Sequence, residues 1–286
     1  MPFPRSSLSL MHLTRAALLL CLATLFCACA NGRQQAAHLA ETARFQPQRY
    51  DTKPFVLQGW LKPGRPGGTL FVYIEGDGMA WRRANRPSSD PTPTDPIGLR
   101  LAIADPATQA EGAILYLARP CQYTEGGDRR GCTVRDWTSA RFSERAVAAL
   151  DEAVNQAKAR TGARSVALHG FSGGGGMAAL LAERRTDVVF LATVAGNLDH
   201  ALWTSLHGDT PLELSLNPVD RAGATRNIPQ LHVIGGRDAV VPKAILDSWC
   251  TRLPGAAITR VTEPEATHSG PWEAVWPGLL RQARKL

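Results

Sequence analysis

The sequence has little that would hold a nucleic acid, a metal ion or a nucleotide. Nearly all of its 32 basic residues are arginines, but they are dispersed rather than clustered among aromatic residues. No spacing of cysteines and histidines fits a zinc site. No lysine follows the glycines at 173–176, as a P-loop requires, and Ser172 interrupts a G-x-G-x-x-G pattern. We therefore expect no nucleic acid partner, no metal and no cofactor, and we interpret the net charge of +7 as a solvated surface.

Internal repeats are also absent, and charged residues make up only 20% of the chain. The 286 residues are 44% hydrophobic, which is an ordinary globular composition. A chain of this length can bury a full core, and it favours one domain or at most two.

Charge is missing altogether from residues 16–30. This apolar run suits the hydrophobic region of an export signal and is too short to span a bilayer comfortably. Ala28-Cys29-Ala30 would allow cleavage before Asn31, whereas Phe26-Cys27-Ala28-Cys29 resembles a bacterial lipobox in which Cys29 is acylated. We favour the lipoprotein signal and leave both open. Either way residues 1–30 predict export, to the periplasm, to an outer-membrane anchor through Cys29, or to the medium.

Cysteines are few beyond that segment. Cys121 and Cys132 bracket a polar, glycine-containing loop, and an exported protein can close such a loop with a disulfide. The chain-entropy model gives such a bond about 3 kcal/mol of stabilisation. Cys250 is left over, and we expect it to be a buried free thiol in a helix.

Residues 31–54 are polar and carry little pattern, so we expect an N-terminal tether, with an early strand as the alternative. From residue 55 to residue 286, short apolar runs alternate with helical patterns. Strands are expected at 55–61, 69–74, 113–117, 166–168, 188–194, 231–234 and 256–261, and helices at 142–160, 177–185 and 272–284. The turn at 63–68 is rich in proline and glycine and suggests that the first two strands form a hairpin.

This alternation predicts an α/β fold with a mostly parallel, doubly wound sheet flanked by helices. Functional residues are then expected at the carboxyl ends of the strands. The segment 198–224 is long and irregular, which suits a small lid or insertion.

A serine flanked by glycines, Gly170-Phe171-Ser172-Gly173-Gly174, follows one of the buried-strand runs and precedes a helical stretch. In that context the G-x-S-x-G pattern indicates a nucleophile elbow, a tight turn that exposes the serine Oγ. Gly170 and Gly174 leave room where strand and helix approach closely. The N–H of Gly173, at a helix N-terminus, can stabilise an oxyanion. Taken alone, the pattern also fits a plain glycine-rich turn.

An acid and a histidine follow the serine in order. Asp238 comes after the strand at 231–234 and a glycine pair, and His268 lies between the last strand and the closing helix. Each alone could be a turn or capping residue. Together with Ser172 they predict a catalytic triad, in which His268 takes the serine proton and Asp238 orients the imidazole.

The loop after the strand at 69–74, Glu75-Gly76-Asp77-Gly78, is the candidate for the rest of an oxyanion hole. The second donor would be the backbone N–H of Asp77, or that of Gly78; a simple Asp-Gly turn is the alternative. Carboxylates there are unfavourable unless both side chains point away into hydrogen bonds. Trp81, Tyr123 and the segment 198–224 are candidates for the substrate pocket, or else packing residues.

These motifs resemble those of the α/β-hydrolase superfamily over residues 55–286. The resemblance rests on Gly170 to Gly174, Gly235-Gly236-Arg237-Asp238 and His268. A closer resemblance, to uncharacterised exported α/β-hydrolases of proteobacteria, rests on Tyr73-Ile74-Glu75-Gly76-Asp77-Gly78, Arg119-Pro120-Cys121-Gln122-Tyr123 and Trp137-Thr138-Ser139-Ala140-Arg141-Phe142. Hydrolases often carry His-Gly at the oxyanion loop, and Glu75-Gly76 departs from that. The resemblance implies about eight strands and no cofactor, and it implies no particular substrate.

The expectation is therefore an exported serine hydrolase, carboxylesterase-type, acting on a small-molecule or lipid-like ester through Ser172, His268 and Asp238. A peptidase or an acyltransferase on the same fold is the first alternative. The second is a non-catalytic binding protein of the cell envelope, because a fold does not fix a function. No protein partner is expected.

Overall fold

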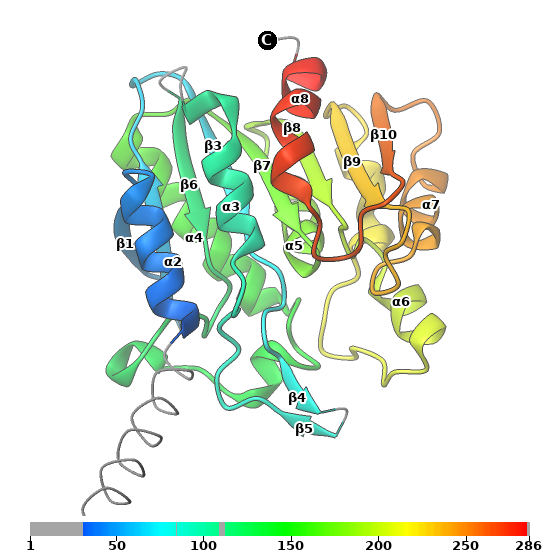
Figure 1. Ribbon diagram of the computed structural model, residues 1–286, viewed down its shortest axis with the longest axis horizontal. Helices are drawn as coiled ribbons and strands as arrows, with labels where there is room; N and C mark the ends of the chain where they lie inside the picture. Colours follow the sequence, from blue (N-terminus) through cyan, green and yellow to red (C-terminus); the bar gives the residue numbers. More distant parts are fainter. Residues whose placement is uncertain (1–30, 84, 109–111, 285–286) are drawn as a thin grey trace, which may run out of the picture.

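The computed structural model describes residues 31–83, 85–108 and 112–284 (Figure 1). The predicted export signal and the acylation of Cys29 lie outside the described residues. Within them, no helix is both long and apolar enough to cross a bilayer.

One sheet of eight strands runs through the described residues, in the order β1-β2-β6-β3-β7-β8-β9-β10 (Figure 1). The strands are β1 Gln46–Asp51, β2 Val56–Lys62, β3 Thr69–Ile74, β6 Ala113–Leu117, β7 Ser165–Phe171, β8 Val188–Val194, β9 Gln230–Gly235 and β10 Ile258–Glu263. Only the β1–β2 and β2–β6 pairs within this sheet are antiparallel, and the other pairs are parallel. The predicted fold class, a mostly parallel doubly wound sheet, is confirmed.

The predicted hairpin between β2 and β3 is wrong, because β6 lies between these two strands. All five residues of β6 are buried, and β6 pairs antiparallel with β2 and parallel with β3. A strand this apolar is stable in the interior of a sheet, covered on both faces. The turn at 63–68 therefore carries the chain past β6, and its Gly67 N–H donates to the carbonyl of Gly162.

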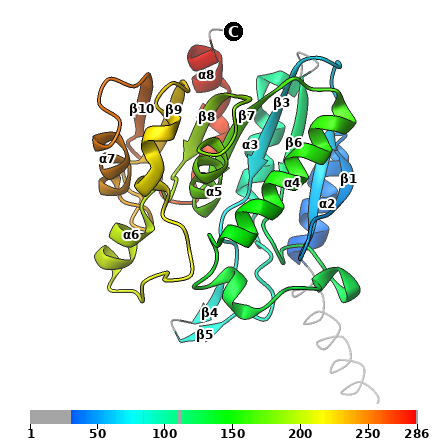
Figure 2. The ribbon, with the colours of Figure 1, turned by 180° about the vertical axis from the view of Figure 1, so that it is seen from behind.

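Helices cover both faces of the sheet. The helices are α2 Asn31–Thr42, α3 Ile97–Ala104, α4 Glu144–Thr161, α5 Gly173–Ala182, α6 His200–His207, α7 Lys243–Thr251 and α8 Trp272–Arg284. Short 3₁₀ helices span Pro106–Thr108, Gly126–Arg129, Val134–Trp137 and Pro218–Thr225. Helices α2, α3 and α8 lie in front of the sheet in Figure 1, and α4, α5 and α7 lie in front in Figure 2. Each face thus has its own hydrophobic core.

Residues 31–54 form helix α2 and edge strand β1, so the expectation of a tether is corrected and its alternative, an early strand, holds for 46–51. Ala36 and Ala40 are fully buried on one side of α2, and Tyr50 of β1 is fully buried opposite Leu57. The small alanine side chains give the helix a buried face without a conspicuous apolar stripe. For this reason the helix escapes a search for hydrophobic periodicity.

Cys121 and Cys132 form a disulfide, as predicted, and it closes the loop between β6 and α4. Cys250 is a half-buried free thiol in α7. The segment 198–224 holds α6 and most of the 3₁₀ helix at 218–225, beside the carboxyl ends of β8 and β9 (Figure 1).

A buried ionic cluster joins α8 to the sheet. Arg284 donates to both oxygens of the Asp105 carboxylate at 2.8 and 2.9 Å, and the Tyr73 hydroxyl donates to the same carboxylate at 2.5 Å. The His169 ring stacks on the Tyr73 ring, and His169 Nε2 faces the Arg284 guanidinium. We call Asp105, Arg284, Tyr73 and His169 the α8 cluster.

The parallel register brings two loops together at the carboxyl end of the sheet. Ile74 of β3 pairs with Gly170 of β7, so the loop that begins at Glu75 lies against the turn at Ser172. A hairpin of two short strands, β4 Trp81–Arg83 and β5 Arg86–Pro87, extends from the same end (Figures 1 and 2).

Candidate active site

Ser172 occupies a sharp turn between β7 and α5. Its backbone has φ 53° and ψ −124°, a conformation that non-glycine residues rarely adopt. The turn is held because the Ser172 N–H donates to Val194 and its carbonyl accepts from Gly175 and Asn197. At Gly170 an added Cβ would lie 2.1 Å from the carbonyl oxygen of Gly174, so only glycine fits there. The sequence pattern thus gives a strained strand-to-helix turn.

The structure brings Ser172, His268 and Asp238 together. His268 Nε2 lies 3.0 Å from Ser172 Oγ, and His268 Nδ1 lies 2.9 Å from Asp238 Oδ2. The other oxygen of Asp238 accepts from the backbone N–H groups of Val240 and Val241, each at 2.8 Å. With Nδ1 protonated and donating to Asp238, Nε2 is free to accept from the serine hydroxyl.

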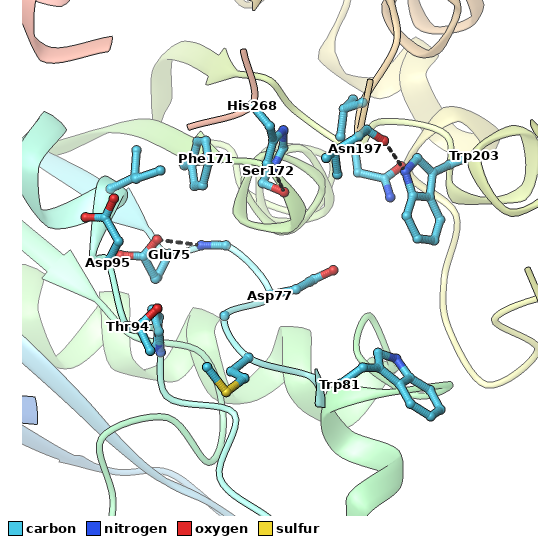
Figure 3. Close-up of a pocket in the computed structure, with 17 residues that line it drawn as sticks. Glu75, Asp77, Trp81, Thr94, Asp95, Phe171, Ser172, Asn197, Trp203 and His268 are labelled. Carbon is cyan, nitrogen blue, oxygen red and sulfur yellow. Dashed lines mark hydrogen bonds between the residues drawn. The ribbon is translucent and has the colours of Figure 1, made fainter. Parts of the chain in front are cut away.

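Ser172 opens into a cavity of about 370 Å³. Figure 3 shows Ser172 and His268 directed toward each other, Asp77 and Trp81 below them in this view, and Trp203 above Trp81 at the right. The lining also includes Glu75, Met79, Thr94, Asp95, Ile97, Phe171, Asn197, Val240 and Val241. The predicted pocket residue Trp81 is therefore at the cavity, and the segment 198–224 contributes Trp203.

Tyr123, the other predicted pocket residue, is elsewhere, and that prediction is corrected. Its ring packs edge-on against Trp60 and contacts Tyr116, and it borders a separate groove beside α2. The disulfide loop accounts for this: Tyr123 has a φ of 57°, and its N–H donates to Thr92 Oγ1, which turns the ring toward the sheet edge.

Gly173 and Asp77, the two predicted oxyanion donors, lie side by side. Gly173 is the first residue of α5, so its N–H has no partner within the helix. An added Cβ on Gly173 would lie 2.1 Å from Asp77 Oδ1. Among the described residues, no hydrogen bond uses the N–H of Gly173 or that of Asp77. Both unpaired donors lie close to Ser172: Asp77 lines the cavity, and Gly173 directly follows the serine in the chain.

The carboxylate of Asp77 is clamped by two buried arginines. Arg119 donates Nη1 to Asp77 Oδ1 and Nη2 to the carbonyl of Arg141, and Arg141 donates Nη1 to Asp77 Oδ2 at 2.6 Å. Burial would raise the pKa of Asp77, but the guanidiniums of Arg141 and Arg119 lower it to about 2. We call Asp77, Arg119 and Arg141 the loop cluster.

The carboxylate of Glu75 is also occupied. It accepts from the N–H groups of Gly76 and Gly98 and from the Tyr116 hydroxyl. Complete burial nevertheless raises the pKa of Glu75. Both acids of the loop therefore point into their own hydrogen bonds, which is the condition under which this loop can border an oxyanion.

Arg119 and Arg141 are functional candidates that sequence reasoning missed. Their common partner, Asp77, is 42 and 64 residues away in the sequence, so no local pattern links the three. Two signals were present. Asp77, Arg119 and Arg141 all belong to the motifs of the closer resemblance, and Arg119 follows the buried strand β6 almost directly, at the carboxyl end of the sheet where function is expected. In the described part of the chain, no three His, Cys, Asp or Glu side chains gather as metal ligands would.

Neither a protein-family model nor a curated protein matches the chain. Solved structures do match. An esterase from Pyrococcus furiosus superposes with a TM-score of 0.60 over 86% of this chain and 92% of its own, at 13% identity. A serine hydrolase homologue from Coxiella burnetii gives 0.55 over 84% and 96%, at 15% identity. A protein of unknown function from Agrobacterium tumefaciens, described as a putative α/β hydrolase, gives 0.56 over 84% and 97%, at 13% identity.

The chain has the α/β-hydrolase fold. Identities this low establish the fold alone, so the chemistry of this α/β-hydrolase fold must be argued from its own residues. On that fold the chain places Ser172, His268 and Asp238 in hydrogen-bond contact, and Ser172, His268 and Asp77 line one cavity.

Proposed function

We propose that the protein is a serine hydrolase of the carboxylesterase type. The continuous hydrogen-bond chain from Ser172 through His268 to Asp238 carries the proposal, at distances of 3.0 and 2.9 Å. The strained turn at Ser172 supports it, because such strain persists where the surrounding structure holds a residue for a task.

The reaction would proceed through an acyl-enzyme. Ser172 Oγ attacks the acyl carbon while its proton passes to His268 Nε2, and the alcohol then leaves with that proton. Water attacks the acyl-enzyme and gives a proton to His268, which passes it to Ser172 Oγ as the acyl–oxygen bond breaks, so the acid leaves and the free serine is restored. Asp238 remains ionised throughout and stabilises the imidazolium.

The N–H groups of Gly173 and Asp77 would bind the oxyanion formed at each attack. A donor of this kind contributes about 3 kcal/mol to the transition state. The loop cluster supports this role, since its two arginines hold the Asp77 carboxylate in place and compensate its charge next to Gly173. In this proposal Arg119 and Arg141 are positioning residues, because they act through Asp77.

The cavity volume of about 370 Å³ lies at the low end for ligand sites, which favours a small acyl or alcohol group next to Ser172. Among the structural neighbours, the Pyrococcus furiosus protein is described as an esterase. We take a small-molecule or lipid-like ester as the substrate class. A panel of esters, amides and lipids distinguishes ester hydrolysis from amide hydrolysis.

Export is part of the same proposal. The disulfide between Cys121 and Cys132 supports an oxidising compartment, and the uncharged run at 16–30 supports an export signal. Mass spectrometry of the mature N-terminus tests it. A diacylated Cys29 would identify the anchored lipoprotein, a start at Asn31 the cleaved form, and an intact Met1 would contradict export.

Substituting the serine tests the catalytic assignment. Ser172→Ala should lower the turnover of p-nitrophenyl esters by on the order of a millionfold and abolish labelling by a fluorophosphonate. Ser205→Ala, at an exposed serine of α6, is the matched control and should retain both. Turnover or labelling that survives in a folded Ser172→Ala protein would refute the assignment.

A further inference from the structure

We propose that the end of the molecule at which the Ser172 cavity opens docks on an anionic lipid bilayer. The contact surface, which we call the docking face, consists of Trp81, Arg82, Arg83 and Arg86 of the β4–β5 hairpin, Leu206 of α6, and Val240. The proposal goes beyond the hydrolase assignment, because it concerns where the protein is held and does not depend on its chemistry.

The hairpin combines an exposed indole with unpaired positive charge. Trp81 is 44% exposed, and Arg82, Arg83 and Arg86 are all exposed. Over the residues that the structure describes, none of these three arginines has a carboxylate partner. The carboxylate of Asp90, four residues beyond Arg86, is paired with Arg33 instead. Tryptophan favours the bilayer interface, and arginines are attracted to anionic headgroups.

The body of the protein fixes the base of the hairpin. The Ser88 N–H donates to the carbonyl of Ala80, and the indole N–H of Trp137 donates to the carbonyl of Ser88 at 3.1 Å. The arginines are therefore presented on a fixed support. Trp81, at the start of β4, also lines the Ser172 cavity, so the hairpin borders the opening.

Apolar side chains continue the surface on the other side of the cavity. Leu206 is 52% exposed and Val240 is 44% exposed, and Val240 lines the cavity. Helix α6 is held next to Val240, whose carbonyl accepts from the indole of Trp203 at 2.6 Å and faces His207 Nε2 at 2.9 Å. Exposed apolar groups gathered around one opening indicate an interaction surface.

The course of the chain gives an independent reason to choose a bilayer as the partner. Helix α2 begins at Asn31 at the same end of the molecule as the β4–β5 hairpin and α6 (Figures 1 and 2). The uncharged run at 16–30 joins the described chain there. An acyl chain on Cys29, two residues before Asn31, would bring the lipid surface within about 7 Å of α2. A nucleic acid partner would use the arginines but leave Leu206 and Val240 unexplained.

Docking in this orientation would turn the cavity opening toward the bilayer. An ester at the level of the lipid headgroups could then reach Ser172 without crossing bulk water. This consequence rests on the proposed function, whereas docking itself does not.

Vesicle binding by the Cys29→Ala protein, expressed from the full chain, tests the proposal without a contribution from an acyl anchor. We expect stronger sedimentation with vesicles of phosphatidylcholine and phosphatidylglycerol than with phosphatidylcholine alone. Changing Arg82, Arg83 and Arg86 together to glutamine should weaken partitioning on the order of a hundredfold, or about fivefold for each arginine. Adding Trp81→Ala to this triple variant should weaken vesicle binding further.

The matched control removes the same charge from the far end of the molecule. Arg44, Arg164 and Arg281 are exposed, precede β1 and β7 or lie in the last turn of α8, and should be dispensable for binding when changed to glutamine. Equal binding by the two triple variants, or equal binding of the parent to neutral and anionic vesicles, would overturn the proposal. Binding to heparin through the arginines without binding to vesicles would also overturn it.

Two further measurements separate docking from catalysis. Ser172→Ala should bind vesicles like the parent, and the hairpin triple variant should hydrolyse a soluble ester at the parental rate. If no ester is hydrolysed but vesicle binding depends on the hairpin arginines, the docking proposal stands while the hydrolase assignment fails.

Discussion

The loop cluster and the α8 cluster are built from the same chemical parts and lie in different places. Each buries an aspartate against arginine, and each is formed by residues far apart in the sequence. The α8 cluster lies between the sheet and its helices, where Arg284 of α8 and Asp105 at the end of α3 meet Tyr73 of β3 and His169 of β7. The loop cluster lies beside Gly173 at the Ser172 cavity.

Because the two clusters lie in different places, we expect their disruption to change different properties of the protein, namely its stability and its catalytic rate. Burying ion pairs costs desolvation energy, so neither cluster is explained by stability alone. Removing one partner of a buried pair leaves a charge without compensation. For the α8 cluster the loss should appear in the free energy of unfolding. For the loop cluster part of the loss should appear in kcat, because Asp77 also carries a proposed oxyanion donor.

The largest effect is expected from Arg284→Met. This change leaves the carboxylate of Asp105 buried without its arginine and should lower the free energy of unfolding by about 3 to 5 kcal/mol. Urea unfolding measures the loss, with the exposed Arg281→Met as control. The rate of fluorophosphonate labelling of the folded fraction should stay unchanged. A slower rate would remove the distinction between the clusters.

Loss of the disulfide should affect the side of the molecule that holds the loop cluster. Cys121 lies two residues beyond Arg119, so the bond to Cys132 restrains the segment that carries the clamp. Changing both cysteines to serine should cost about 3 kcal/mol in the free energy of unfolding. Cys250→Ser is the control and should cost less. If the variant with Cys121 and Cys132 changed to serine unfolds at the same urea concentration as the parent, the disulfide does not stabilise the protein and this prediction is wrong.

Arg119→Lys should chiefly change catalysis. Lysine keeps the charge but cannot bond both Asp77 and the carbonyl of Arg141, as the guanidinium does. We expect kcat to fall by up to about a hundredfold, the worth of one oxyanion donor, with little change in KM. Steady-state kinetics separates the two constants. A rise in KM at constant kcat would show that the clamp shapes substrate binding instead.

The smallest effect concerns pH. Burial, together with the nearby Arg284, lowers the pKa of His169 to about 3. In the unfolded chain the pKa of a histidine is about 6.5. Below that pH the unfolded chain therefore binds a proton that the folded, buried His169 does not bind. For this reason the free energy of unfolding falls as the pH falls. The slope is about 1.4 kcal/mol per pH unit. Asp77, with a pKa of about 2, contributes in the same direction only below about pH 4.

His169→Gln should reduce the slope between pH 6 and pH 4.5 by about 1.4 kcal/mol per pH unit relative to the parent, in urea unfolding at a series of pH values. The buried His232, whose pKa is also lowered to about 3, keeps its own contribution. The exposed His38→Gln is the control and should follow the parent. If His169→Gln and the parent lose stability in parallel, the buried neutral histidine of the α8 cluster is not the source.

The sequence allowed the sheet and the position of Ser172, Asp238 and His268 to be predicted, because buried strands and glycine turns leave local patterns. Strand β3 matches its predicted bounds, and helix α4, predicted at 142–160, spans Glu144–Thr161. Strand order could not be obtained this way, since the insertion of β6 between β2 and β3 depends on pairing across the sheet.

The loop cluster could not be predicted for a related reason. Nothing near Arg119 or Arg141 in the sequence points to Asp77, because the three residues meet only through the fold. Tyr123 shows the reverse case: its position in the sequence suggested the cavity, but the backbone conformation after Cys121 directs it toward Trp60. Local patterns predict elements, whereas contacts between loops require the tertiary structure.

The most direct test of the central claim is fluorophosphonate labelling followed by mass spectrometry of the labelled peptide. The account predicts one adduct on Ser172 in the parent protein, markedly slower labelling in His268→Gln, and none in Ser172→Ala. A folded parent protein that reacts with no fluorophosphonate, or an adduct on another serine that persists in Ser172→Ala, would contradict it.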